Sequence, residues 1–168
     1  MRIGKNFRIW IGASTMGLVF FPVKAMACGL ALLLAVDVSL SIDAAEYELQ
    51  ATGMAKALLQ EDVQLAIAAS PGGVAVAVMQ WSAGDEQHLA LPWTLLSDAS
   101  EINRFAFEIA NMPRAFSGNT APGSALEFGV DLHNSNPWRC LRRVIDISGD
   151  GSQNSGVDTG AASYAAVN

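Results

Sequence analysis

Three short segments of this sequence carry side-chain oxygens that could bind a metal ion. They are residues 37–41 (DVSLS), residues 118–120 (GNT) and residues 146–150 (DISGD). On an extended turn, residues 37, 39 and 41 point to one side, so a single loop can deliver three oxygens. Carboxylate and hydroxyl oxygens make a hard site that suits Mg²⁺, Mn²⁺ or Ca²⁺ and is poor for zinc or copper.

The hydroxyl groups in these segments also indicate what such a site would do. Ser39 and Ser41 are neutral ligands, so a cation held mainly by them would keep residual positive charge. Such a cation can accept a carboxylate from outside as its last ligand. This chemistry favours adhesion over catalysis.

The strands that must position these segments can be located from apolar runs. Residues 29–36 and 74–82 are apolar almost throughout, which is typical of strands covered on both faces. Residues 142–147 (RRVIDI) form another predicted strand. Residues 88–96 are expected to pair with the second strand as a hairpin, at an edge of the sheet because of Pro92.

Helices are predicted between these strands. Capping boxes at Asp43/Glu46 and Asp98/Glu101 open helices of about 43–60 and 98–111. Further helical stretches are expected at residues 62–68, at residues 121–134 and from Gly160 onward.

The order β-α-β-β-α-α-β predicts an α/β fold: a Rossmann-like, doubly wound, mostly parallel sheet with flanking helices. Ligands of such sheets gather beyond the carboxyl ends of the strands, where the strand order reverses. The first and fourth strands flank that point, so the three segments are expected to converge there.

The motifs VDVSLSID, GNTAPGSAL and RRVIDISGDGSQN, taken together, resemble the metal-ion-dependent adhesion site (MIDAS) of von Willebrand factor A domains. More narrowly, the chain resembles a family of uncharacterised exported bacterial proteins with a von Willebrand factor A-like domain. The resemblance covers about residues 28–168. It implies that Mg²⁺, or alternatively Mn²⁺ or Ca²⁺, is held by Asp37, Ser39, Ser41, Thr120 and Asp150. The hydroxyls would bind directly, and one or both aspartates would act through water.

The sequence departs from this family pattern in two respects. Leu40 stands where many relatives have Gly, at a position that does not bind the metal. A complete domain of this type has six strands, so residues 28–168 are expected to lack the last ones.

Residues 1–27 have the organisation of a secretory signal peptide. A basic start is followed by an apolar run at residues 9–21, by Pro22 and by the small-x-small pattern Ala25-Met26-Ala27. An uncleaved anchor is the alternative, but Pro22 and Lys24 interrupt the roughly 20 apolar residues that a membrane span needs. We therefore expect a periplasmic or secreted protein with no membrane span after cleavage.

The charge distribution separates this leader from the rest of the chain. Four of the ten basic residues precede Cys28, whereas all sixteen acidic residues follow it. Nucleic acids and anionic membranes require a basic surface, so an acidic domain argues against both as partners.

The two cysteines are candidates for a disulfide. Cys28 lies nine residues before Asp37, and Cys140 lies ten before Asp150. If those aspartates end neighbouring parallel strands, both cysteines lie at the opposite end of the same pair, within bridging distance. Two separate buried thiols, or lipid attachment at Cys28, are the alternatives.

Other functional classes fit the same residues less well. Asp37, Ser39, Ser41 and Glu48 match EF-hand positions, but Ile42 stands where that loop requires Gly. A serine hydrolase would need a G-x-S-x-G elbow and a suitable histidine. His88 is expected to lie in the edge hairpin, away from the loops at the carboxyl ends.

The sequence thus predicts a non-enzymatic module that recognises a protein partner through a metal-bound acidic side chain of that partner. A structural or assembly protein with a purely stabilising metal is the alternative. A metal-dependent hydrolase would also need a general base, for which no candidate lies near the site.

Overall fold

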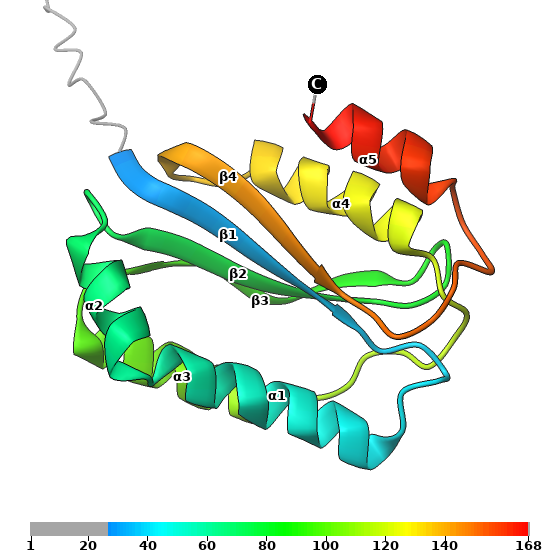
Figure 1. Cartoon of the computed structure of the whole chain (residues 1–168), viewed down its shortest axis with the longest axis horizontal. Helices are drawn as coiled ribbons and strands as arrows, with labels where there is room; N and C mark the ends of the chain where they lie inside the picture. The colour runs from blue at the N-terminus through cyan, green and yellow to red at the C-terminus, as the bar shows by residue number, and fades with distance from the viewer. Residues whose placement is uncertain (1–26, 168) are drawn as a thin grey trace, which may run out of the picture.

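The computed structural model describes residues 27–167, so the expected signal peptide at residues 1–27 lies outside this range except for Ala27. In chain order the elements are β1 (Ala27–Asp37), α1 (Ala44–Leu58), α2 (Glu61–Ala69), β2 (Val74–Trp81), β3 (Gln87–Leu96), α3 (Ala99–Ala110), α4 (Pro122–Asn134), β4 (Arg139–Ser148) and α5 (Thr159–Val167) (Figure 1). Within residues 27–167, no helix has the length and apolar character needed to span a membrane.

The four strands form one mixed sheet in the order β3-β2-β1-β4. The central strand β1 runs parallel to both β2 and β4, and β3 runs antiparallel to β2. All eight residues of β2 are buried, as expected from a sequence that is apolar except for Gln80. Pro92 lies in the edge strand β3, where a residue without an N–H is tolerated. The predicted doubly wound, mostly parallel α/β fold is confirmed.

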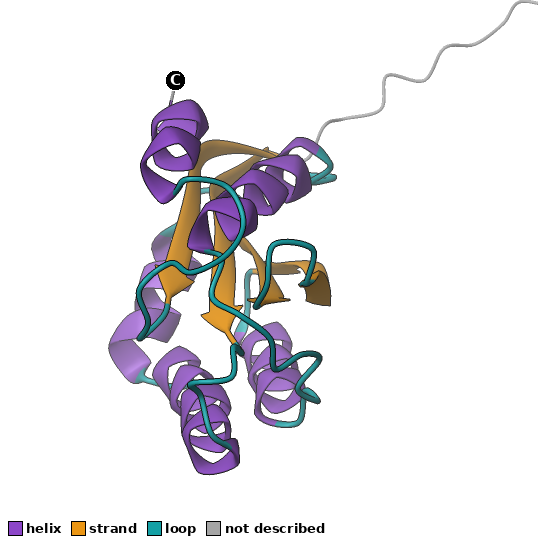
Figure 2. Cartoon of the chain, turned by 90° about the vertical axis from the view of Figure 1, so that its right-hand side faces the viewer, coloured by secondary structure: helices purple, strands orange, loops and turns teal. Residues whose placement is uncertain are grey.

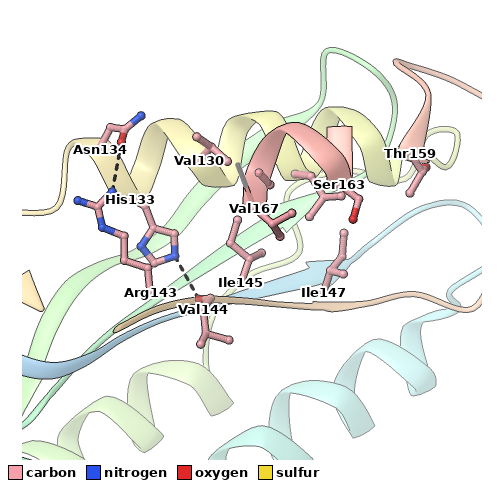
Figure 3. A pocket seen from close by; sticks show the side chains of 12 residues that line it. Val130, His133, Asn134, Arg143, Val144, Ile145, Ile147, Thr159, Ser163 and Val167 are labelled. Atoms are coloured by element: carbon pink, nitrogen blue, oxygen red, sulfur yellow. Dashed lines mark hydrogen bonds between the residues drawn. The ribbon is translucent and has the colours of Figure 1, made fainter. Parts of the chain in front are cut away.

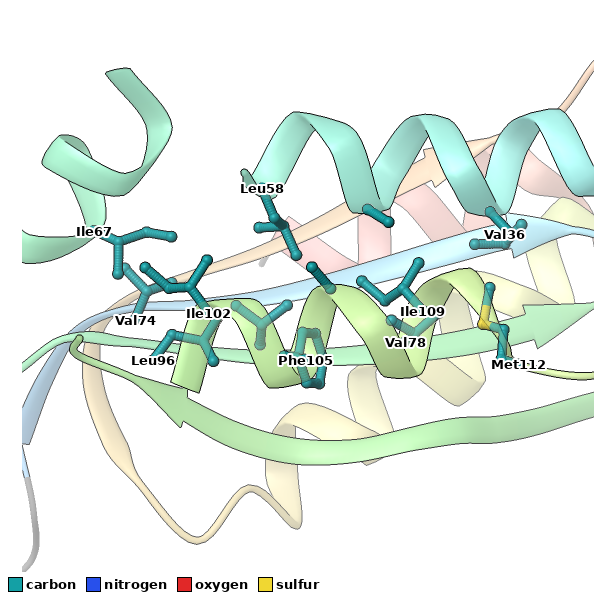
Figure 4. Close-up of a cluster of buried hydrophobic side chains, with 14 of the residues drawn as sticks. Val36, Leu58, Ile67, Val74, Val78, Leu96, Ile102, Phe105, Ile109 and Met112 are labelled. Carbon is teal, nitrogen blue, oxygen red and sulfur yellow. The ribbon is translucent and has the colours of Figure 1, made fainter. Parts of the chain in front are cut away.

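Helices cover both faces of this sheet (Figures 1 and 2). Helices α1, α2 and α3 lie on one face, and α4 and α5 lie on the other. The α3 side chains Ile102, Phe105 and Ile109 are almost fully buried. Their spacing along the sequence gives α3 one apolar face, which packs toward the sheet and α1 (Figure 4). Each such side chain contributes about 1.5–3 kcal/mol through burial.

Two capping motifs fix where helices begin. Asp43 accepts a hydrogen bond from the Glu46 amide, and the Glu46 carboxylate accepts one from the Asp43 amide, which confirms the predicted capping box. Asp98 also caps α3, but the Glu101 carboxylate accepts from both the amide and the hydroxyl of Ser97 instead. Ser97, one residue before Asp98, offers Glu101 two donors, its amide and its hydroxyl. The Glu101 carboxylate therefore bonds to Ser97 and not to the Asp98 amide, and the capping box is incomplete.

Cys28 and Cys140 form a disulfide across the β1–β4 pair, as predicted. The two residues are direct register partners, with Cα atoms 4.3 Å apart. The bond therefore ties the amino-terminal ends of these strands together, while Asp37 and Asp150 lie at their carboxyl-terminal ends. Strand β4 is exposed along much of its length, so the disulfide fixes a strand that has little buried surface of its own.

Candidate metal site at the carboxyl ends of the strands

The parallel pairing of β1 and β4 brings two of the predicted segments together. Val36 is the register partner of Ser148, so the chain leaves both strands at the same edge of the sheet. The close approach at this edge involves Gly149. A Cβ atom at this glycine would lie 3.0 Å from Asp37 Oδ2 and 3.1 Å from a ring carbon of Trp81. Glycine thus allows the β4 end to pass directly beside the Asp37 carboxylate.

Hydrogen bonds connect four of the five predicted ligands. The Asp37 Oδ1 atom accepts a 2.7 Å bond from the Ser39 amide. The Ser39 and Ser41 hydroxyl oxygens lie 3.1 Å apart, and the Ser41 hydroxyl donates to Asp150 Oδ1 at 2.9 Å. Residues of β1 and β4 that are far apart in sequence therefore share one polar cluster.

Thr120, the fifth predicted ligand, approaches the same cluster from the α3–α4 loop. A Cβ atom at Gly151 would lie 3.4 Å from Thr120 Oγ1 and 3.9 Å from Ser41 Oγ, so both hydroxyls lie beside one point next to Asp150. Asn154 holds the threonine in place: its side chain accepts from the Thr120 amide at 2.8 Å, and its own amide donates to the Thr120 carbonyl. The sequence reasoning did not identify Asn154.

The cluster contains a buried oxygen with no partner. Asp37 and Ser39 are fully buried, and Asp37 Oδ2 has no hydrogen-bond donor among the described residues. Leaving a buried carboxylate oxygen unsatisfied is costly in free energy. A cation beside this oxygen would remove that cost, so the donor set present here fits a hard divalent ion.

The outer part of the cluster is open to solvent. Ser41 and Asp150 are exposed, whereas Thr120 is 5% exposed. In residues 27–167, no three His, Cys, Asp or Glu side chains gather as a metal-binding group, so hydroxyls must supply part of any coordination here. The cluster therefore runs from a buried carboxylate at Asp37 to solvent-exposed oxygens at Ser41 and Asp150.

A second hydrogen-bond network anchors the loop that carries Thr120. Gln80 is fully buried on β2; its amide nitrogen donates to the Tyr47 hydroxyl and the Pro113 carbonyl, and its Oε1 accepts from the Ala115 amide. The Tyr47 hydroxyl in turn donates to the Met112 carbonyl. Burial raises the pKa of Tyr47 above its ordinary value, against the opposing effects of the Gln80 hydrogen bond and the Arg114 charge. A polar residue inside an apolar strand was the signal that could have identified Gln80.

The two histidines lie outside the cluster. His133 is buried on α4; its Nε2 lies 3.1 Å from the Val144 carbonyl, and its ring lies 5.0 Å from that of Trp93. It lines a cavity of about 440 Å³ between α4, β4 and α5 (Figure 3). Burial lowers the pKa of His133, although its hydrogen bond to Val144 acts in the opposite direction.

His88 lies nearer to the carboxyl-end loops than predicted. Its ring contacts Phe116 of the α3–α4 loop edge-on, with centroids 6.5 Å apart. The reason is the antiparallel direction of β3, which begins beside the end of β2, where Gln87 pairs with Trp81. No hydrogen bond joins either histidine to the five predicted ligands within the described part of the chain.

A family model described as "Protein of unknown function (DUF1194)" matches residues 27–168. This chain belongs to that family. The match covers the whole domain described above. None of the curated proteins compared with this DUF1194 chain matches it.

Solved structures share the fold of this DUF1194 domain. Proximal thread matrix protein 1 from the mussel byssus superposes with a TM-score of 0.64 at 20% identity, over 83% of this chain and 35% of that one. Another structure of the same mussel protein, described as having a zinc-occupied MIDAS motif, gives 0.65 at 17% identity with the same coverage. The PilB minor pilin from Streptococcus sanguinis gives 0.55 at 17% identity, over 78% of this chain and 31% of that one.

These likenesses confirm the von Willebrand factor A-like fold. The DUF1194 chain spans about a third of the length of these proteins. At such low identity the likeness concerns the fold, and the ligand set must be argued from the residues of this chain.

Proposed function

We propose that this chain is an exported binding module that holds a divalent cation at the carboxyl ends of β1 and β4. The ligands would be the five residues predicted from the sequence: Asp37, Ser39, Ser41, Thr120 and Asp150. The observation that carries the proposal is the buried, unpartnered Oδ2 of Asp37 beside a cluster of hydroxyls. A carboxylate in that position requires a compensating positive charge.

The exposed rim favours recognition of an external ligand. Ser41 and Asp150 are accessible to solvent, so a side chain from another protein can reach the cation. The bound cation would supply residual positive charge for an acidic side chain of the partner. The two aspartates formally balance a divalent charge, but aspartates that act through water leave direct coordination mainly to the three neutral hydroxyls, so the cation can still accept a carboxylate from outside.

The choice of ion follows from the donor atoms. An oxygen-only set suits a hard divalent ion, for which Mg²⁺ is the first choice and Mn²⁺ and Ca²⁺ are the alternatives. The mussel protein with a zinc-occupied MIDAS supports a divalent ion in a site of this type, and it makes zinc a necessary comparison.

Export is part of the proposal. Residues 1–27 have the sequence pattern expected of a signal peptide, and a disulfide between Cys28 and Cys140 is typical of an oxidising compartment outside the cytosol. We therefore place the module in the periplasm or outside the cell, where it would meet a protein partner.

Calorimetric titration of the full chain with Mg²⁺, Mn²⁺, Ca²⁺ and Zn²⁺ tests the proposal. We expect Asp37→Ala and Thr120→Ala to lose most of the affinity. Asp131→Ala on α4 and Thr52→Ala on α1 remove the same side-chain groups away from the cluster and should leave the affinity unchanged. Absence of binding, or equal binding by all four variants, would contradict the proposed cation site.

A stabilising metal without a partner is the second candidate. It would be favoured if an internal side chain completed the coordination, leaving no position for an external carboxylate. The exposed Ser41 and Asp150 argue against this arrangement. Titrating acetate into the Mn²⁺-loaded chain, and following water relaxation at the ion, distinguishes the two: displacement of bound water supports adhesion, and no change supports a structural metal.

A further inference from the structure

Arg114, on the loop between α3 and α4, reaches the loop that carries Ser39 and Ser41. Its Nη2 atom donates hydrogen bonds to the Val38 carbonyl at 2.9 Å and the Ser39 carbonyl at 2.8 Å. Its Nε atom donates to the Phe116 carbonyl of its own loop at 2.9 Å. One planar guanidinium therefore joins two loops that both carry proposed ligands.

The peptide unit between Ser39 and Leu40 is held at both of its polar groups. The carbonyl of this unit accepts from Arg114, and its N–H, which belongs to Leu40, donates to the Gly118 carbonyl at 2.8 Å. In a trans peptide these two groups point in opposite directions. Two residues of the α3–α4 loop therefore clamp this peptide from opposite sides and fix the orientation of its plane.

Arg114 forms no ion pair with a carboxylate among residues 27–167. Within residues 27–167 the one ion pair is between Arg104 and Glu108, so the Arg114 guanidinium is satisfied by main-chain carbonyl groups. The residue is half-buried, and hydrogen bonds from a charged donor are roughly twice as strong as neutral ones. The loop geometry at Ser39 thus depends on a strong and directional contact.

We infer that Arg114 is a positioning residue for the cation site, which sets the Ser39 and Ser41 hydroxyls relative to Thr120 by orienting the Ser39–Leu40 peptide. The inference rests on the proposed function. Arginine is required because its fork can donate to carbonyls of both loops at once, whereas the single ammonium of lysine cannot reproduce that geometry.

Three variants of the full chain test this role. Arg114→Met removes the donors but retains much of the side-chain bulk, and Arg114→Lys retains the charge. Arg104→Met, on the exposed face of α3, is the control with the same charge change. We expect Arg114→Met to weaken Mn²⁺ binding about tenfold or more, because it removes hydrogen bonds from a charged donor. The Mn²⁺ affinity of Arg114→Lys should lie between those of the unsubstituted chain and Arg114→Met. Arg104→Met should bind Mn²⁺ with the affinity of the unsubstituted chain.

Hydrogen exchange in EDTA gives a readout that needs no bound metal. Loss of the clamp should speed exchange of the Leu40 amide in Arg114→Met while the Val78 amide in the centre of β2 keeps its protection. Arg104→Met should change neither amide. If the Val78 amide also exchanges faster in Arg114→Met, Arg114→Lys is the variant to compare. Weaker Mn²⁺ binding by Arg114→Lys with the Val78 amide still protected supports the inference, and unchanged Mn²⁺ binding by Arg114→Lys overturns it.

The outcomes separate this inference from the proposed function. If the unsubstituted chain binds Mn²⁺ and Arg114→Met behaves like Arg104→Met in both measurements, the positioning role is wrong and the cation site stands. If the unsubstituted chain binds no divalent ion, the proposed function is wrong, and the positioning role is overturned with it.

Discussion

The hydroxyl of Ser41 donates a 2.9 Å hydrogen bond to Oδ1 of Asp150, although 109 residues separate the two in sequence. The bond joins the loop after β1 to the loop after β4. These strands lie side by side in the sheet and end at the same edge. The proposed ligands thus converge because of the sheet topology, and changes that disturb this edge should affect cation binding first.

Gly149 provides a direct test of the close packing at this edge. A methyl group in Gly149→Ala would lie 3.0 Å from Asp37 Oδ2 and 3.1 Å from a ring carbon of Trp81, which is closer than ordinary van der Waals contact. We expect a loss of about 1–3 kcal/mol in the free energy of unfolding, measured with urea, together with weaker Mn²⁺ binding. Gly53→Ala is the control, because nothing lies near a Cβ at this exposed position on α1; it should be neutral or stabilising. Equal free energies of unfolding and equal Mn²⁺ affinities for the two variants would show that the end of β4 is not closely packed against Asp37.

The disulfide should contribute substantially to stability. The disulfide joins two cysteines that are 112 residues apart in sequence, and it holds the exposed strand β4 to β1. Replacing both Cys28 and Cys140 with alanine should lower the free energy of unfolding by about 2–5 kcal/mol. Dithiothreitol should lower the urea midpoint of the unsubstituted chain and leave that of the double variant unchanged. A midpoint that does not respond to the reductant in either protein would be incompatible with this role.

His133 should make stability depend on pH. Burial lowers the pKa of His133 in the folded chain, so the unfolded chain takes up the proton first as the pH falls below the ordinary value of 6.5. The stabilising contribution is therefore complete above pH 6.5 and is lost as the pH falls toward the lower pKa of the folded state. Urea midpoints at pH 7.5, 6.5 and 5.5 measure the effect. His133→Gln should show a shallower decline below pH 6.5, and parallel curves would disprove the assignment to His133.

Gln80 should contribute strongly to the thermal stability of the domain. Gln80→Leu keeps the approximate side-chain volume but leaves the Ala115 amide, the Pro113 carbonyl and the Tyr47 hydroxyl without this partner. A hydrogen bond of this kind contributes about 0.5–1.5 kcal/mol, so the loss of three at a fully buried side chain should clearly lower the melting temperature. Gln60→Leu, at an exposed position after α1, is the matched comparison and should change the melting temperature little. A similar melting temperature for both variants would rule out the anchoring role.

The sequence predicts those parts of the site that depend on local pattern. The apolar run that stops at Asp37 located the end of β1, and the predicted strand at residues 142–147 ended one residue before β4 does. The alternation of strands and helices placed those ends together. Asp43 with Glu46 located the start of α1 for the same reason, since a capping box is complete within four residues. Pattern was therefore sufficient for the fold and for the convergence of the three segments, whereas the choice of five ligands came from the family resemblance and stays a prediction.

The supporting residues could not be predicted in this way. Arg114, Gln80 and Asn154 act through hydrogen bonds to groups 33 to 76 residues away, and nothing in their neighbouring sequence indicates those partners. The start of β4 at Arg139 also preceded the expected Arg142, because that exposed, charged segment becomes a strand through pairing with β1 and the disulfide. Long-range contacts determine these features.

Anomalous diffraction from crystals of the full chain grown with Mn²⁺ tests the central claim most directly. We expect a peak beside Asp37 Oδ2 within coordination distance of the Ser41 and Thr120 hydroxyls, and its loss in Asp37→Ala. A map with no peak at the carboxyl ends of β1 and β4, or a peak that persists in Asp37→Ala, would contradict it.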